Sequence, residues 1–277
     1  MVIASLVLAL GLGAAPERIV STAPSITQML YALGLGDRIV GVTTFCRYPP
    51  EARRKPKIGD YLRPNLELVV AARPDLVIVE RTGVRTPLAR GLVSAPVLEV
   101  DDGTLAGIYD TIEAIGRAAG VPDRAAALNA RLRAELEELE RRMAGRPRPR
   151  TMVVLGRTPG RLEGIVVAGR GSYLEELLRL AGGQNIFGDT VSPYAKVPLE
   201  EVLARDPEVI VDLGEMGDHN GPDAARRQAV LALWKTQPKV SAVRNGRVFV
   251  EPPDLFVVPG PRVGEAARAL ARMIHAR

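Results

Sequence analysis

The sequence predicts an α/β protein of two Rossmann-like lobes joined by a single long helix. Three observations lead to this prediction: an internal repeat, buried-strand patterns inside each copy, and one amphipathic segment between the copies. With 277 residues, the chain has room for two lobes of roughly 100–130 residues each. We expect the N-terminal lobe at residues 16–121, the bridging helix at 122–145 and the C-terminal lobe at 146–277.

The repeat consists of two pairs of matching segments in the same order. The stretch that begins at Leu66 aligns without a gap with the stretch that begins at Leu199. Each copy reads as a short helix, a proline turn and a continuous apolar run, which is typical of a parallel strand buried on both faces. Upstream, Ser25 and Ser172 each begin a capping box at a helix start. Two similar lobes follow, with chance similarity of common helix–strand units as the alternative.

The segment between the copies predicts one amphipathic helix. Apolar residues recur every three or four positions from Pro122 to Ala144, and charged residues occupy the other face. Pro122 suits a first helical turn, and Gly145 closes the far end. Such a helix of about 22 residues measures roughly 33 Å; the pattern is too short for a convincing coiled coil. Because one helix makes a stiffer joint than two flexible strands, we expect little hinge closure.

The N-terminus carries a targeting signal. The apolar run Val2–Leu12, followed by the small residues Gly13–Pro16, predicts a signal peptide at residues 1–15. A buried first strand is the alternative. No cysteine follows the small residues, so we expect a secreted protein without a lipid-attachment site. Cys46 is the single cysteine, which excludes an intramolecular disulfide; we expect it to be a packed residue.

The chain offers little for catalysis. It has no Gly-x-Ser-x-Gly elbow, no Walker loop and no His-Glu-x-x-His motif, so we expect neither enzymatic activity nor a cofactor. His219 and His275 are the only histidines, too few for a metal carrier built from several. The formal charge is +5, but the basic residues are scattered rather than gathered on one stretch, and we expect no nucleic-acid partner.

Aromatic residues in loops are the remaining candidates for a binding site. Aromatic content is only 4%, yet Tyr48, Tyr61, Tyr194 and Phe256 fall near predicted strand ends or helix starts, where α/β sheets bind ligands. Aromatic faces from two lobes would sandwich a large planar or macrocyclic ligand. For each of these residues, local packing is the alternative; Trp234 we assign to packing.

Several motifs together resemble one known family, the periplasmic substrate-binding proteins of ABC importers for cobalamin, haem and ferric siderophores. The resemblance covers nearly the whole mature chain, and Pro-Asn-Leu-Glu after Gly-x-Tyr looks most like the cobalamin-binding branch. The residues that carry it are Arg18–Gly41, Cys46–Ala52, Pro64–Glu67, Arg73–Ile78, Gly182–Phe187 and Val243–Val248.

The resemblance implies that a ligand lies between the lobes. By position, Tyr61 and Tyr194 would contact it, Asp254 matches a cleft acid, and Pro24 with Ser25 would border the pocket. Together with Tyr48 and Phe256, these are the ligand-binding candidates. Two tyrosines stand where the best-studied member has tryptophan, and some haem carriers place an axial tyrosine near Tyr61. Cobalamin and haem both remain open as transported ligands.

The resemblance also gives a role to two acidic residues of the repeat. Glu67 and Glu200 occupy equivalent places at helix starts, where acids favour the helix N-terminus. The family implies that each docks into an arginine pocket on one ABC permease subunit of the inner membrane. We therefore expect a monomeric carrier of cobalamin or a related corrinoid. A haem or ferric-siderophore carrier is the alternative. A chelatase-like α/β enzyme is the alternative from another class, but it needs a histidine or carboxylate pair facing the cleft, and we expect none.

Overall fold

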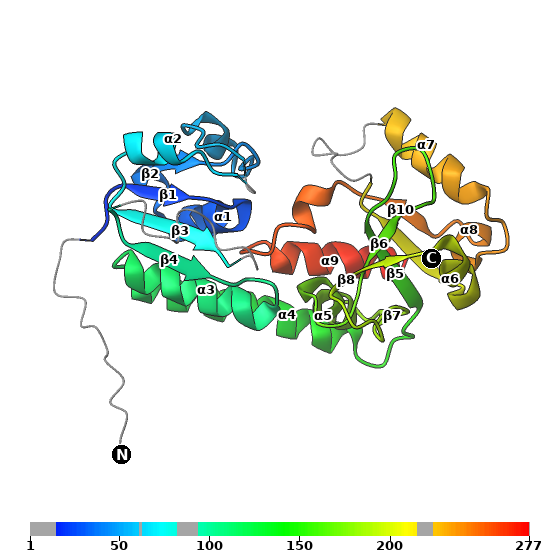
Figure 1. The fold of residues 1–277 in the computed structure, drawn as a ribbon. Helices are drawn as coiled ribbons and strands as arrows, with labels where there is room; N and C mark the ends of the chain where they lie inside the picture. Colours follow the sequence, from blue (N-terminus) through cyan, green and yellow to red (C-terminus); the bar gives the residue numbers. More distant parts are fainter. Residues whose placement is uncertain (1–14, 61–62, 82–93, 215–223, 277) are drawn as a thin grey trace, which may run out of the picture.

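The protein consists of two lobes that lie side by side, with a long helix running beneath both (Figure 1). The structure is a computed structural model, and it describes residues 15–60, 63–81, 94–214 and 224–276. Residues 1–14 of the expected signal peptide, Tyr61 and His219 lie outside these residues. In the described part of the chain, no helix is both long and apolar enough to cross a membrane.

The N-terminal lobe is built on a four-stranded parallel sheet in the order β2-β1-β3-β4. All three residues of β1 and four of the five in β3 are buried, as expected for central strands covered on both faces. The strands are β1 (Ile19–Ser21), β2 (Ile39–Val42), β3 (Leu76–Glu80) and β4 (Val97–Val100). The helices are α1 (Pro24–Ala32), α2 (Leu66–Ala71) and α3 (Leu105–Ala118), with 3-10 turns at Gly36–Arg38 and Pro50–Arg54.

The C-terminal lobe has a mixed sheet in the order β10-β9-β5-β6-β8, with β7 also paired to β5. Strands β6 and β8 are antiparallel, which extends the expected Rossmann-like arrangement. The strands are β5 (Arg150–Gly156), β6 (Ile165–Ala168), β7 (Gln184–Asn185), β8 (Tyr194–Val197), β9 (Val209–Asp212) and β10 (Val248–Val250). The helices are α5 (Tyr173–Leu180), α6 (Leu199–Arg205), α7 (Ala224–Lys235), α8 (Ser241–Arg244) and α9 (Val263–Ile274), with a 3-10 turn at Pro253–Leu255.

The two lobes share one parallel framework, which confirms the internal repeat. In the first lobe β1 pairs with β2 and β3, and in the second β5 pairs with β7 and β9, all in parallel. The register is also repeated: Val77 lies opposite Val97, and the equivalent Ile210 lies opposite Val248. Chance similarity does not reproduce strand order and register together. The repeat is therefore structural.

The contacts that hold each repeated helix to its sheet are duplicated as well. The Asp75 carboxylate accepts a hydrogen bond from the backbone N–H of Arg18 at 2.9 Å, and the Glu208 carboxylate accepts one from that of Arg150 at 2.8 Å. The guanidinium groups of the same two arginines donate to carbonyl oxygens at the ends of α2 and α6. Each lobe thus uses one arginine and one acid to fix a helix–strand turn.

The two expected capping boxes differ in the structure. Ser172 caps α5, because its Oγ accepts the N–H of Glu175 at 3.2 Å. Ser25 does not cap α1: the helix begins at Pro24 with Ala23 as its N-cap, two residues earlier than a cap at Ser25 implies. Proline is favoured at the first helical position because its φ is already helical and it has no N–H to satisfy. The capping prediction for Ser25 was wrong, and this residue lies inside the first turn.

The bridging helix is α4 (Pro122–Met143), as the sequence predicts. It packs against α3 of one lobe and against α5 and α9 of the other. Its buried face consists of Ala125, Leu128, Asn129, Leu132, Leu136 and Leu139. The largest hydrophobic core is continuous through both lobes, from Ile19 in β1 to Ile274 in α9. A helix embedded in a shared core is a stiff connection, and we keep the predicted lobe boundaries as a proposal.

Candidate functional site

Five side chains from both lobes gather where the lobes meet, and we call them the interlobe cluster. The cluster consists of Ser25, Glu80 and Asp102 from the N-terminal lobe and Tyr173 and Tyr194 from the C-terminal lobe. Each lies at the end of a strand or the start of a helix or strand: Ser25 in the first turn of α1, Glu80 at the end of β3, Asp102 after β4, and the two tyrosines at the first positions of α5 and β8. The charge of Asp102 raises the pKa values of both tyrosines, so groups of the two lobes lie within electrostatic reach of one another.

Asp102 is the most unusual member of this cluster. It is 1% exposed, and neither carboxyl oxygen makes a hydrogen bond. Removal from water raises its pKa to about 7, and the charge of Glu80 adds to this rise. The nearby Ser25 hydroxyl opposes the rise, and Asp101 strengthens it. Buried polar groups are nearly always hydrogen-bonded in proteins, so this carboxyl is an exception that requires an explanation.

The two tyrosines present different surfaces. Tyr194 is 43% exposed, yet desolvation, followed by the charges of Asp102 and Glu80, raises its pKa to about 12. Tyr173 is 2% exposed, and its hydroxyl donates a hydrogen bond to the backbone oxygen of Phe256. Burial, then Tyr194 and Asp102, raises the pKa of Tyr173 well above its ordinary value. Both phenols are therefore neutral, and Tyr194 is the one that offers an accessible ring.

Backbone contacts tie the two lobes together beside this cluster. The N–H of Tyr173 donates to the oxygen of Gly103 at 3.1 Å. The N–H of Leu105 donates to the Glu176 carboxylate, also at 3.1 Å. The turn that carries Asp102 is thus attached to the first turns of α5. Groups from opposite lobes are held at a fixed spacing at this point.

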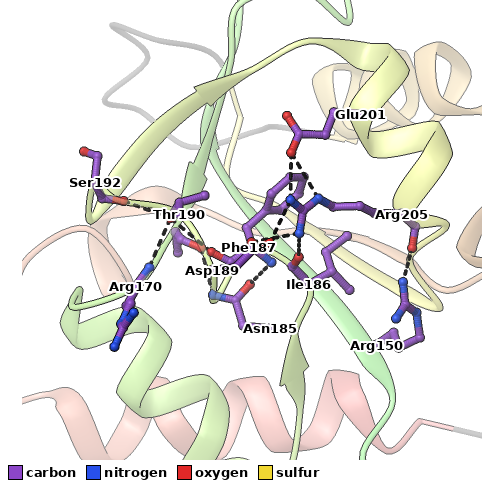
Figure 2. Close-up of polar contacts among 11 residues, drawn as sticks. Arg150, Arg170, Asn185, Ile186, Phe187, Asp189, Thr190, Ser192, Glu201 and Arg205 are labelled. Carbon is purple, nitrogen blue, oxygen red and sulfur yellow. Dashed lines mark hydrogen bonds and ion pairs between the residues drawn. The ribbon is translucent and has the colours of Figure 1, made fainter.

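A polar network supports the strand that carries Tyr194. Figure 2 shows the Arg205 guanidinium, which donates to both carboxylate oxygens of Asp189, at 2.8 and 3.1 Å. The same guanidinium lies over the Phe187 ring, 4.8 Å from its centroid. The hydroxyl of Thr190 bonds the carbonyl oxygen of Ser192 at 3.0 Å. These contacts fix the path of the chain from β7 into β8, and with it the position of Tyr194.

Tyr48 lies in a groove among α1, α4 and the turn before α9, with a volume of about 660 Å³. The guanidinium of Arg262 covers its ring at 4.1 Å from the centroid. Two polar atoms of α1, Gln28 Oε1 and Tyr31 Oη, are buried without a hydrogen-bond partner. The residues that line the groove are Gln28, Tyr31, Ala32, Gly34, Gly36, Asp37, Tyr48, Pro49, Glu51, Arg131, Glu135, Pro261, Arg262, Glu265 and Arg268.

The structure brings together only some of the predicted ligand contacts. Ser25 and Tyr194 meet in the interlobe cluster, and the half-buried Pro24 precedes Ser25. Asp254 is half-buried in the 3-10 turn after β10. Phe256 needs a correction: its side chain is 1% exposed and packs in the main core, so it presents no ring face to a ligand here.

Sequence reasoning missed Asp102 and Tyr173. One signal pointed to Asp102, because Asp101 and Asp102 follow a parallel strand at its carboxyl end, where ligands bind in α/β sheets. Glu80 lies near enough to Asp102 for its charge to raise the pKa of Asp102.

Glu67 and Glu200 lie on equivalent exposed positions. Each is the second residue of its helix, α2 or α6, and neither forms an ion pair with a described residue. An exposed apolar residue lies one turn further along each helix: Val70 is 50% exposed, and the equivalent Leu203 is 38% exposed. The repeat thus presents a matching acidic and apolar pair on each lobe.

The other chemical candidates are structural within the described residues. No group of three or more histidine, cysteine or acidic side chains that could hold a metal ion occurs in this part of the chain. Cys46 is buried, and its Sγ accepts a hydrogen bond from the Thr27 hydroxyl. Trp234 is fully buried and donates from Nε1 to Asp212 at 2.8 Å, which confirms its packing role.

Two lobes of like topology, held apart by a stiff helix and facing each other across a cluster of neutral phenols and acids, define a two-lobed solute-binding protein. Comparison with known proteins agrees with this class. Residues 19–255 match the family described as periplasmic binding protein, and the chain belongs to that family.

Relatives cover most of the chain. A vitamin B12-binding protein of Vibrio parahaemolyticus is 30% identical over 248 residues, which span 89% of this chain and 85% of the relative. An uncharacterized ABC transporter substrate-binding lipoprotein of Bacillus subtilis is 29% identical over 94% of this chain and 80% of its own. A solved periplasmic haem-binding protein from Pseudomonas aeruginosa has a TM-score of 0.80 at 26% identity, covering 94% of this chain and 93% of that one. Proteins named for different ligands therefore match this chain over most of its length.

Proposed function

We propose that this protein captures cobalamin or a related corrinoid between its lobes in the periplasm and delivers it to an ABC permease of the inner membrane. The ligand is cargo rather than a cofactor, and the protein performs no chemistry on it. The interlobe cluster carries this proposal, because it sets an accessible tyrosine of one lobe against a serine and an acid of the other. The relative named for vitamin B12 supports the choice of ligand.

A titration tests the proposal directly. Cyanocobalamin, haemin and a ferric hydroxamate are added in separate absorption titrations, followed by calorimetry. We expect cyanocobalamin to bind as a one-to-one complex. Replacing Tyr194 by alanine removes an exposed aromatic face and weakens binding by roughly tenfold, or about 1.4 kcal/mol. Tyr194→Phe keeps the ring and is the matched control, with affinity close to that of the unmodified protein. Absence of any cyanocobalamin binding contradicts the proposal.

Haem is the second candidate ligand, and the match to a solved haem-binding protein favours it. An axial tyrosine binds haem iron as phenolate. Desolvation and the neighbouring acids raise the pKa of Tyr194 to about 12, which disfavours Tyr194 as the axial ligand and leaves Tyr61 as the candidate for that role. If haem is the cargo, haemin binding gives a Soret shift in the same titration, and cyanocobalamin gives none.

We also propose that Glu67 and Glu200 dock the carrier on the two permease subunits. Both acids are exposed, and each has a neighbouring exposed apolar side chain at the same place in the repeat. Two equivalent surfaces suit a permease with two equivalent subunits. Charges of this kind steer encounter and orientation more than they add affinity.

The docking role is separable from a role in helix stability. In vesicles reconstituted with the permease, Glu67→Gln with Glu200→Gln should abolish transport and leave ligand affinity unchanged. Glu137→Gln, which changes another exposed acid on α4, is the control and should transport normally. If the acids serve only their own helix N-termini, the double variant loses about 0.3–1 kcal/mol of stability per site and transports as before.

A further inference from the structure

Asp102 lies at the lobe interface, and among the described residues the Ser25 hydroxyl is the side-chain donor that acts on its carboxylate. It follows β4, whose carboxyl end points toward the C-terminal lobe (Figure 1). The residue is 1% exposed, and both Oδ atoms lack a hydrogen-bond partner. A buried carboxyl without partners typically costs several kcal/mol when ionised. Such groups are rare in folded proteins and require an explanation, and a bound molecule that donates a hydrogen bond is one explanation.

The surroundings of Asp102 contain acids and neutral groups. Glu80 faces it from β3, Asp101 from its own turn and Ser25 from α1. From the C-terminal lobe, Tyr194 of β8 and Tyr173 of α5 are coupled to it. The Glu176 carboxylate of α5 is hydrogen-bonded to the same turn, at the N–H of Leu105.

We propose that Asp102 is a ligand-recognising residue of the N-terminal lobe, and that it selects a ligand presenting an amide N–H over one presenting a carboxylate. This inference rests on the proposed function and refines its ligand class. A corrinoid bears peripheral amides, whereas haem bears two propionates. An amide N–H satisfies an Asp102 oxygen, while a propionate places a second negative charge beside the buried Asp102 carboxylate.

The two ligand chemistries have opposite pH signatures. An amide donor stabilises ionised Asp102 and lowers its pKa in the complex below the value of about 7 in the free protein. Affinity for an amide ligand then rises with pH up to about 7 and is level above it, with protons released on binding. A ligand carboxylate raises the pKa instead, so affinity is level below pH 7 and falls above it, with protons taken up. One proton changes affinity by at most about tenfold per pH unit.

The test uses cyanocobalamin and its monocarboxylic acids, in which one peripheral amide is replaced by a carboxyl. Calorimetry of the unmodified protein between pH 5.5 and 8.5, in two buffers of different ionisation enthalpy, measures affinity and proton release together. We expect rising affinity and proton release for cyanocobalamin. We expect the opposite for the monocarboxylic acid whose carboxyl faces Asp102.

Two variants assign the effect to one residue. Asp102→Asn removes the charge with little change of shape and should flatten both pH profiles. Asp110→Asn alters an exposed acid on α3 that does not act on the pKa of Asp102, and it should leave both profiles unchanged. Cyanocobalamin binding with identical pH profiles in Asp102→Asn and the unmodified protein overturns the role of Asp102 and leaves the proposed function intact. Absence of corrinoid binding at every pH overturns the proposed function and the selectivity with it.

Discussion

The two lobes share a framework and differ in what is added to it. Four parallel strands in the order β2-β1-β3-β4 correspond to β7-β5-β9-β10, and the helix–strand turn of each lobe is held by an arginine and an acid. Even the strained backbone is repeated, because Arg73 and Asp206 occupy equivalent positions with φ values of 44° and 38°. The repeated features are those that hold the fold together.

Other features occur in one lobe only, as far as the described residues go. The antiparallel pair β6–β8, which carries Tyr194, has no counterpart among the described residues of the N-terminal lobe. Within the same described residues, the buried ion pair of Arg157 and Asp212 belongs to the C-terminal lobe, and the buried Asp102 carboxyl belongs to the N-terminal lobe. The repeated residues thus form the scaffold. We expect ligand recognition to depend on residues that have no equivalent in the other lobe.

Among these features, the buried ion pair of the C-terminal lobe should have the largest effect on the free energy of unfolding. Arg157 Nε and Asp212 Oδ2 are 3.2 Å apart with both side chains fully buried, and Asp212 also accepts from Trp234. Asp212→Ala removes a carboxylate that pairs with the buried Arg157 guanidinium, and we expect a loss of about 3–5 kcal/mol in the free energy of unfolding. Chemical denaturation measures it.

A neutral double replacement is the control for that experiment. Arg157→Met with Asp212→Leu removes both charges, and we expect it to recover much of the stability lost in Asp212→Ala. If Asp212→Ala lowers the free energy of unfolding by less than about 1 kcal/mol, the ion pair does not stabilise the C-terminal lobe as proposed.

The next largest effect should be the pH dependence of stability that Asp102 of the N-terminal lobe causes. Because its folded pKa of about 7 exceeds the ordinary 3.8, the folded state holds this proton longer than the unfolded state. Its contribution to stability therefore falls as pH rises from about 4 to 7, by at most ~4 kcal/mol at 1.36 kcal/mol per pKa unit. Asp102→Asn should remove this slope, as followed by urea denaturation at several pH values. Parallel slopes for the two proteins would contradict the raised pKa.

The smallest effects should come from the duplicated turns. Asp75 accepts backbone N–H groups of Glu17 and Arg18, whereas Glu208 accepts that of Arg150. Because the contacts are exposed, we expect Asp75→Ala and Glu208→Ala each to cost about 1 kcal/mol, with the larger loss for Asp75. Glu137→Ala on α4 is the control and should stay within about 0.5 kcal/mol. If only one of the two variants loses stability, the two turns are not energetically equivalent.

Most of the scaffold could be predicted from the sequence, because periodicity and repetition are local signals. The 22-residue bridging helix and the buried strands β3 and β9 follow from apolar spacing alone. The start of α1 was misplaced because Pro24 and Ser25 both suit a helix start, and only the backbone decides between them.

The site could be predicted only in part. Tyr194 stood out because aromatics are scarce, whereas Asp102 looks like an ordinary turn acid until the other lobe buries it. Phe256 misled for the opposite reason, since a phenylalanine in a loop looks available until packing covers it. Burial between segments far apart in sequence is a tertiary property, and no local pattern reports it.

Hydrogen exchange with and without cyanocobalamin tests most directly the claim that unmatched residues of both lobes hold the ligand. The account predicts simultaneous protection in the turn after β4, at residues 101–105, and in β8, at residues 194–197. The duplicated turns near Arg73 and Asp206 should exchange as before. Protection confined to one lobe, or spread equally over the duplicated turns, would contradict it.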